Sequence, residues 1–408
     1  MTPLPRHIAD TIVADPPSGE HADLGTNPNP LRLNSYDEWS ALRAVIVGSG
    51  RHHPAHDRDL SFDLFLYENI VEDNDLAAKP WLRPPFTGPR QRIPIAQQYL
   101  DELDEDIAGL VTTLESVGIT VHRPLELDPA TTEIRTPAWS ATMLPALNIR
   151  DSVIVLGDEI VETPPLMRAR YFENQLLKPT FLEYFRRGAR WSVMPRPVMT
   201  DGSFDFSYVA GSGSPDEPIT VTTRPDDSPY RVGVEPMLDA AQIVRFGRDV
   251  LVNVSTAHHQ LAFDWLERQF AGRLRFHRVY RLSDDHIDST VVPLRPGLLL
   301  VRGPEVLDRL PRPLQRWDHI CYPEPTGLPG YGPDDLVLAS RYIDMNVLSI
   351  GPDTVLANPD HPALIRQLEA KRIDVIPVRH RHRRLFGGGF HCFTVDVVRD
   401  GEATDYFD

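Results

Sequence analysis

The stretch from Ile149 to Thr163 reads IRDSVIVLGDEIVET. A polar pair precedes a short apolar run, a Gly-Asp turn follows, and a second apolar run completes the stretch. Two short apolar runs joined by a tight turn are typical of a β-hairpin with buried strands. The stretch therefore predicts a hairpin that begins with a polar group, here Asp151.

Looser copies of this pattern recur along the chain. They are GRDVLVNVS from Gly247, HIDSTVVPLRPGLLLV from His286, DMNVLSIGPDTVLANP from Asp344, HCFTVDVVRDG from His391 and, as a weaker member, EWSALRAVIVG from Glu38. Repetition of one structural unit favours several similar units around a centre. Their leading polar residues would then converge at that centre.

Helices are predicted between the hairpins. Apolar residues from Leu100 to Val117 recur at steps of three and four, and Gly118 follows as a stop signal. Three further helical segments are residues 168–187, with an interruption near Pro179, residues 256–270 and residues 362–370. The fold class is therefore α/β.

Length and composition predict one folded domain after a flexible tail. The chain has 408 residues, 41% of them apolar, which is enough for a substantial core. Residues 1–35 are expected to form the tail and residues 36–408 the domain. Two stretches rich in Pro, Gly and Asp, residues 51–95 and 201–230, are either lids over a site or surface excursions without a role.

Charge and cysteine content exclude several classes of protein. Lysine and arginine number 42 against 58 acidic residues, a net charge of −16, which argues against nucleic acid or an anionic membrane as a partner. Two cysteines cannot form a disulfide framework or a cysteine-based metal site. No apolar run reaches the ~18 residues of a membrane helix. The sequence predicts a cytoplasmic location.

Cys392 follows three glycines in LFGGGFHCFTVD, residues 385–396. Side chains alternate along an extended segment, so His391 points away from the face of Cys392 and is a poor general base for it. The glycines permit unusual backbone conformations and close approach of a ligand. A buried structural cysteine after a flexible loop is the alternative interpretation.

His286 lies among Asp284, Asp285 and Asp288, in DDHID. Such crowding of acids is costly unless a cation binds there. A solvated acidic turn is the alternative, and a single histidine lacks a specific zinc spacing. Asp151 and Asp249 each follow an arginine and precede an apolar run. Each is either a carboxylate at the entrance of a strand or an ordinary turn residue.

Together these motifs resemble the amidinotransferases of the guanidino-group-modifying superfamily. The matching motifs are RD at 150–151, FGRD at 246–249, HID at 286–288, MNVL at 345–348 and GGGFHC at 387–392. The segments VEPMLDAAQIVRFG from Val234 and DSTVVPLRPGLLL from Asp288 are closer still to the inosamine-phosphate amidinotransferases. The resemblance implies a five-bladed α/β propeller of ββαβ units with one central site.

The resemblance also implies roles for individual residues. Cys392 would be the nucleophile, His286 the general acid and base, and Asp249 the carboxylate partner of the histidine. Asp151 and Asp288 would hold the guanidinium of L-arginine, the donor, and a primary amine would be the acceptor. No metal or organic cofactor is implied, and a homodimer is left open.

The substrate-binding side departs from the family pattern. Ser340 matches a family serine near the substrate, and Asp285 replaces a methionine, which hints at a polyhydroxylated or cationic acceptor. Glu305 occupies the position of an arginine that holds the donor carboxylate. Either Arg302 takes over that role or the donor is not ordinary arginine. The basic run RHRHRR, residues 379–384, is either a phosphate contact for the acceptor or a solvated loop. Two alternative functions are a guanidine hydrolase of the same superfamily and a silent guanidine-binding protein.

Overall fold

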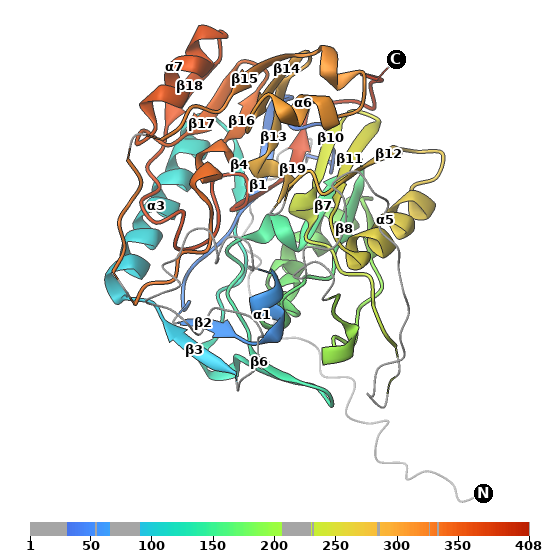
Figure 1. Ribbon diagram of the computed structural model, residues 1–408, viewed down its shortest axis with the longest axis vertical. Helices are drawn as coiled ribbons and strands as arrows, with labels where there is room; N and C mark the ends of the chain where they lie inside the picture. Colours follow the sequence, from blue (N-terminus) through green and yellow to red (C-terminus); the bar gives the residue numbers. More distant parts are fainter. Residues whose placement is uncertain are drawn as a thin grey trace, which may run out of the picture. The chain divides into compact units, whose positions relative to one another are not determined.

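The computed structural model of the chain describes residues 31–53, 55–65, 90–205, 230, 232–283, 286–325, 327–332 and 334–407 (Figure 1). The described residues from Arg32 onward form one compact unit. Asn34 and Ser35, predicted to lie in the tail, already belong to it, because their backbone N–H groups donate to Val397 and Gly157 at 3.0 and 2.9 Å. The folded unit therefore begins before residue 36.

Four sheets of the unit repeat one ββαβ pattern. The first two strands are antiparallel, and the third runs parallel to the second after a helix. The four sets are β7 (Val153–Leu156), β8 (Glu159–Glu162), α4 (Lys178–Arg186) and β9 (Arg190–Val193); β10 (Ile243–Phe246), β11 (Asp249–Val254), α5 (Ala257–Gln269) and β12 (Arg275–Tyr280); β13 (Val291–Arg295), β14 (Leu298–Val301), α6 (Glu305–Arg309) and β15 (Asp318–Cys321); and β16 (Leu348–Gly351), β17 (Thr354–Ala357), α7 (Pro362–Ala370) and β18 (Asp374–Pro377).

The two ends of the chain build the fifth sheet together. β19 (Thr394–Arg399) pairs antiparallel with β1 (Leu42–Val47), and β4 (Thr120–His122) runs parallel to β1 after α3 (Gln97–Ser116). The segments from Glu38 and from His391 were predicted as two members of the repeat. That prediction is wrong, because each supplies one strand to the same unit.

Neighbouring sheets share clusters of buried apolar side chains. These clusters join the β7 sheet to the β10 sheet, the β10 sheet to the β13 sheet, the β13 sheet to the β16 sheet and the β16 sheet to the β1 sheet. β19 in turn contacts β7. The order of packing closes on itself, which is consistent with a five-bladed α/β propeller. The α/β class is confirmed.

The helices with regular apolar spacing lie where the sequence predicts them. α3 ends two residues before Gly118, which has a φ of +82°. Thr256 caps α5 by accepting a hydrogen bond from the His259 N–H, and α7 spans the predicted residues. The predicted helix at residues 168–187 is instead two 3₁₀ turns, η5 (Arg168–Arg170) and η6 (Glu173–Leu177), followed by α4. Pro179 lies in the first turn of α4, where a missing N–H is tolerated, so it begins a helix rather than interrupting one.

The remaining elements lie outside the five three-stranded sheets. They are β2 (Ala55–Arg58), α1 (Leu60–Phe65), β3 (Gln91–Pro94), η3 (Pro129–Thr131), β5 (Glu133–Arg135), β6 (Ser140–Thr142), η7 (Asp201–Ser203) and η10 (Leu314–Arg316). Of these, β2 with β3 and β5 with β6 form two-stranded sheets of their own. The predicted lid at residues 51–95 contains β2, α1 and β3, while residues 66–89 and most of the stretch 201–230 lie outside the described part. No helix in the described part is long and apolar enough to cross a membrane.

Candidate active site

The polar residues of the site come from equivalent positions in the five units. A short 3₁₀ turn precedes the first strand in four of them: η4 (Ile149–Asp151) before β7, η8 (Ala240–Gln242) before β10, η9 (Ile287–Ser289) before β13 and η11 (Arg341–Met345) before β16. The turn at Phe390–Phe393 precedes β19 in the fifth. η4 contacts η8, η8 contacts η9, and η9 contacts η11. The strand entrances therefore converge, as the sequence predicts for its leading polar groups.

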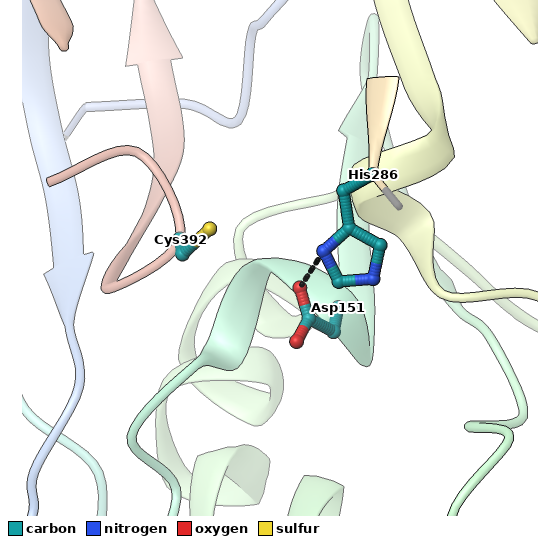
Figure 2. A group of neighbouring side chains, drawn as sticks. All are labelled: Asp151, His286 and Cys392. Atoms are coloured by element: carbon teal, nitrogen blue, oxygen red, sulfur yellow. Dashed lines mark ion pairs between the residues drawn. The ribbon is translucent and has the colours of Figure 1, made fainter. Parts of the chain in front are cut away.

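Cys392, His286 and Asp151 meet at this centre (Figure 2). One donor atom from each of the three side chains lies within 4.8 Å of the other two, and all three residues are buried. The Nδ1 of His286 is 3.6 Å from Oδ1 of Asp151, and its Nε2 is 3.2 Å from Oδ2 of Asp239. Asp239 precedes η8 and was not identified from the sequence. With Nε2–H directed at Asp239, Nδ1 faces the cysteine with its lone pair.

Asp288 and His391 form a second buried pair beside the sulfur. Nδ1 of His391 donates to Oδ2 of Asp288 at 2.7 Å, and its Nε2 lies 3.4 Å from Glu38. Asn346 donates to the same Asp288 oxygen at 2.8 Å and accepts the Cys392 N–H at 2.9 Å. Sγ of Cys392 lies 3.7 Å from this oxygen. His391 thus faces Asp288 and Glu38 instead of Cys392, as the alternation of side chains predicts.

Burial and the surrounding charges shift the pKa values of these groups. Burial, helped by the Asp288 carboxylate, raises the pKa of the Cys392 thiol to about 12. Burial would raise the pKa of Asp288, but the hydrogen bond and charge of His391 outweigh it and hold that pKa below its usual value. Burial and Arg150 would lower the pKa of His391, but Asp288 and Glu38 raise it. Burial raises the pKa of Asp151 against the effects of His286 and Arg170.

Two carboxylate oxygens at the centre lack a hydrogen-bond partner. Oδ1 of Asp151 and Oδ1 of Asp288 are buried and have no hydrogen-bond partner within the described structure, although the second oxygen of each is bonded. The 3.6 Å contact of Asp151 Oδ1 with Nδ1 of His286 is longer than a hydrogen bond. Arg170 holds Oδ2 of Asp151 at 2.5 Å, and Glu173 in turn holds Arg170. Unpaired buried carboxylate oxygens are costly, and they point to a ligand that donates hydrogen bonds.

A fully buried ion-pair network supports the site from behind. Asp396 of β19 pairs with Arg150, Arg245 and Arg399, and Arg245 also pairs with Glu38 at 2.6 Å. Glu38 thereby links the network to His391. Removing one member would leave the others as uncompensated buried charges, so the network anchors η4, β10 and β19 to one another.

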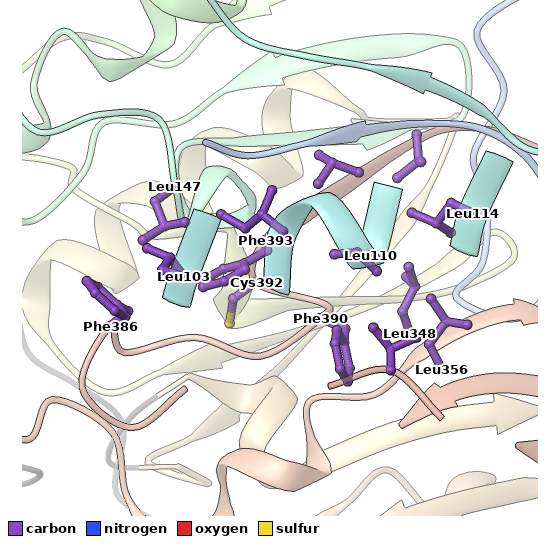
Figure 3. Close-up of a cluster of buried hydrophobic side chains, with 14 of the residues drawn as sticks. Leu103, Leu110, Leu114, Leu147, Leu348, Leu356, Phe386, Phe390, Cys392 and Phe393 are labelled. Atoms are coloured by element: carbon purple, nitrogen blue, oxygen red, sulfur yellow. The ribbon is translucent and has the colours of Figure 1, made fainter. Parts of the chain in front are cut away.

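Cys392 also belongs to a large apolar cluster. Figure 3 shows it among side chains from α3, β16, β17 and its own loop, including Leu103, Phe390 and Phe393. The preceding glycines allow this packing: Gly387 has a φ of +65°, and a Cβ on Gly389 would lie 2.7 Å from Cβ of Asn346. The loop therefore needs glycine on steric grounds.

The donor atoms of Asp151, His286 and Cys392 are also types that bind zinc. A metal on Cys392 would occupy the sulfur lone pairs that a nucleophile needs. The unpaired oxygens of Asp151 and Asp288 and the base beside the thiol suit a cationic organic substrate equally well.

Comparison with known proteins gives one consistent result. No family model matches the chain. It is 34% identical over 379 residues to inosamine-phosphate amidinotransferase 1 of Streptomyces griseus, covering 92% of this chain and 99% of that protein. It is 31% identical over 378 residues to the L-arginine:L-lysine amidinotransferase of Pseudomonas savastanoi pv. phaseolicola, covering 91% and 96%.

The chain belongs to the amidinotransferase family. The solved structure of the Streptomyces griseus inosamine-phosphate amidinotransferase superposes with a TM-score of 0.75 at 32% identity, covering 92% of this chain and 99% of that one. The resemblance inferred from the five motifs is thus confirmed over nearly the whole chain.

This amidinotransferase does not place Asp249 beside His286, so the prediction that Asp249 is the carboxylate partner of the histidine is wrong. Asp249 opens β11, the second strand of its unit, just after the hairpin turn at Gly247. Its oxygens accept from Arg275 at 2.8 and 2.7 Å, and His277 lies 2.6 Å away. Residues at the centre instead precede a first strand, and in this unit that residue is Asp239. The position of a polar residue before the first strand is the signal that could have identified it.

The predicted substrate-binding residues fall into different places in the amidinotransferase fold. Ser340 caps η11, and Arg302 stacks 4.3 Å over the ring of Tyr342 and donates to Ser289, one residue from Asp288. In the described part of the chain, the side chains of Ser340 and Arg302 contact Tyr342 and Ser289 rather than Cys392 or His286. Asp285 lies outside the described residues. Glu305 is exposed at the start of α6.

Four residues of the basic run at residues 379–384 pair with acids of the fold. Arg379 and Arg381 pair with Asp106 of α3, His382 pairs with Glu102, and Arg383 pairs with Asp344. The Arg379 side chain is still 59% exposed, so one end of the run is solvated, while Arg381, His382 and Arg383 are held by acids of the fold.

Proposed function

We propose that the protein transfers the amidino group of L-arginine to a primary amine through a covalent intermediate on Cys392. One observation favours this most: the unpaired Oδ1 atoms of Asp151 and Asp288, which belong to two carboxylates beside the thiol and the imidazole. A guanidinium is planar, stays protonated, and donates five N–H bonds in a fixed fork that suits two carboxylates. Bound between them, it would present its central carbon to Sγ.

The substrate itself would activate the nucleophile. In the free enzyme the Cys392 pKa of about 12 keeps the thiol protonated at neutral pH. A guanidinium between Asp151 and Asp288 offsets their negative charge and favours the thiolate, whose proton passes to Nδ1 of His286. Asp239 stabilises the imidazolium formed, as the carboxylate partner of a general base does.

Two half-reactions follow. The thiolate bonds to the guanidino carbon, the bond from that carbon to the δ-nitrogen of ornithine breaks, and His286 gives its proton to the leaving nitrogen. The amine then attacks the amidino carbon, His286 takes a proton from the attacking nitrogen, and the C–S bond breaks to return the thiolate. Neither half-reaction needs an added oxidant or reductant.

The proposal includes a reducing cytoplasm as the setting, because a nucleophilic thiol must stay reduced. Both cysteines are free thiols in the structure. Association of two copies stays a prediction, and sedimentation velocity would test it.

Mass spectrometry of the intact protein tests the first half-reaction. Incubation with L-arginine alone should add one amidino group at Cys392 and release one equivalent of ornithine, and Cys392→Ser should do neither. Citrulline or urea as the product would instead support the hydrolase. Binding of arginine without adduct or product would contradict the proposed transfer.

A further inference from the structure

A pocket opens onto the catalytic centre from the side of β2 and α1. Asp151 and His286 of the centre line it together with Phe62, Phe65 and Met167. An amine that attacks an amidino group on Cys392 must come within reach of His286. The body of such an amine would therefore lie in this pocket.

Two buried histidines give the pocket its polar character. His53 and His56 are 5% and 3% exposed, and their rings lie edge to face with centroids 5.3 Å apart. Burial lowers the pKa of His53 to about 4 and lowers that of His56 well below its usual value. Both rings are thus neutral at pH 7, and a neutral imidazole offers one donor and one acceptor.

Three polar atoms of this wall have no partner within the described structure. They are Nδ1 of His53, Nε2 of His56 and Oδ1 of Asn148, all buried. A native protein rarely leaves such atoms unpaired without a reason, and a ligand with several neutral hydrogen-bonding groups would satisfy them. Hydroxyl groups both donate and accept, so they match a mixed set of this kind.

The described lining offers no free cation to an anionic ligand. Arg170 is its one arginine, and that guanidinium is taken up by Glu173, Asp151 and the Asn148 carbonyl. Arg302, the residue expected to hold the donor carboxylate, is not part of this lining. Four residues of the nearby run at residues 379–384 pair with acids of the fold, as described above.

We propose that this pocket selects the acceptor, and that the acceptor is a hydroxylated primary amine without a phosphate or carboxylate group. His53, His56 and Asn148 form hydrogen bonds with its hydroxyl groups, and the aromatic side chains of the pocket pack on its carbon skeleton. A buried anion without a counter-ion would be costly there. The inference rests on the proposed function, and the acceptor it names differs from the inosamine phosphate and the L-lysine in the names of two relatives.

Matched pairs of amines test the inference on the wild-type enzyme. After loading with L-arginine, the rate at which each amine discharges the adduct is measured by intact mass. The pairs are an inosamine with its phosphate, and 3-amino-1-propanol with β-alanine, with propylamine as the apolar reference. The member without the anionic group should react at least about tenfold faster than the member that carries a phosphate or carboxylate. An equal or faster reaction of the phosphate- or carboxylate-bearing member would overturn the inference.

Variants then test the two histidines. In His53→Leu and His56→Leu, the preference for 3-amino-1-propanol over propylamine should fall at least about tenfold, because the partners of the hydroxyl are lost. His122→Gln is the matched control, since His122 bonds to Tyr184 away from the pocket. An unchanged preference in both pocket variants would overturn the assignment.

A binding measurement separates this inference from the proposed function. If L-arginine forms no adduct, the proposed function fails, and the same pairs are titrated into Cys392→Ser by calorimetry. Tighter binding of the hydroxylated amine without the anionic group would still support the pocket assignment. Equal or tighter binding of the phosphate- or carboxylate-bearing amine would overturn it.

Discussion

Nε2 of His286 lies 3.2 Å from Oδ2 of Asp239, and this contact sets the direction of the imidazole. With its Nε2–H directed at Asp239, the ring presents Nδ1 to Asp151 and Cys392. The side chain of Asp239 is only 2% exposed. Asp239 lies directly before η8, the turn that precedes β10, and this position brings its carboxylate to the centre. The carboxylate partner of the histidine is therefore set by the order of strands within the unit.

Asp239→Asn should reduce transfer about 100-fold or more, because an amide can hold the wrong tautomer and does not stabilise the imidazolium. Asp249→Asn should mainly lower stability, by about 1–3 kcal/mol, since Arg275 and His277 lose their partner. Steady-state kinetics and thermal unfolding of both variants check this. A larger loss of activity in Asp249→Asn than in Asp239→Asn would contradict the geometry.

The thiol of Cys392 should react slowly in the free enzyme and with a steep pH dependence. Because its pKa is raised to about 12, alkylation by iodoacetamide should still rise about tenfold per pH unit between pH 8 and 10. Peptide mass spectrometry measures the rate, and Cys321, which is partly exposed, reports general access of the reagent. A plateau for Cys392 below pH 9 would show that the thiolate forms without substrate.

His391 should act as a positioning residue for Asp288. Its hydrogen bond holds the pKa of Asp288 low, so the carboxylate is charged throughout the neutral range. In His391→Asn the pKa of Asp288 should rise, and the acid limb of kcat/KM for arginine should move about one pH unit or more toward neutral, because activity is lost as pH falls through that pKa.

The pH profile distinguishes this role from a general loss of structure. His361→Gln is the control, because His361 is equally buried and bonds to the Pro323 carbonyl. An acid limb that stays in place in His391→Asn, with only the maximum lowered, would assign His391 a structural role alone.

Gly389→Ala should impair catalysis through Asn346. The added methyl group would lie 2.7 Å from Cβ and 2.8 Å from Oδ1 of Asn346, which holds both Asp288 and the Cys392 N–H. We expect at least about a tenfold loss of kcat, because small displacements at a reacting centre are costly.

A second glycine provides the control for this substitution. Gly109 lies within α3 and an added methyl group there meets nothing within 4 Å, so Gly109→Ala should raise stability by about 0.5–1 kcal/mol. Equal activity of Gly389→Ala and wild type would contradict the steric argument.

The sequence alone predicted the features that depend on neighbouring residues. The apolar spacing of α3, α5 and α7 and the hairpins predicted from Ile149 and from His286 arise within short segments, where each side chain contacts mainly its own helix or strand. Alternation along the chain was sufficient to separate His391 from Cys392. Five short motifs were sufficient to indicate the family.

The tertiary structure decided the features that depend on which segments meet. Closure of the ring pairs β1 with β19 across more than three hundred residues. It also places Asp239 rather than Asp249 beside His286, because the residues at the centre precede the first strand of their unit. The same packing pairs part of the basic run with acids of α3 and leaves two carboxylate oxygens unpaired beside Cys392. Local sequence contains the residue types, but burial and partners follow from packing between distant segments, and these set the charge of each group.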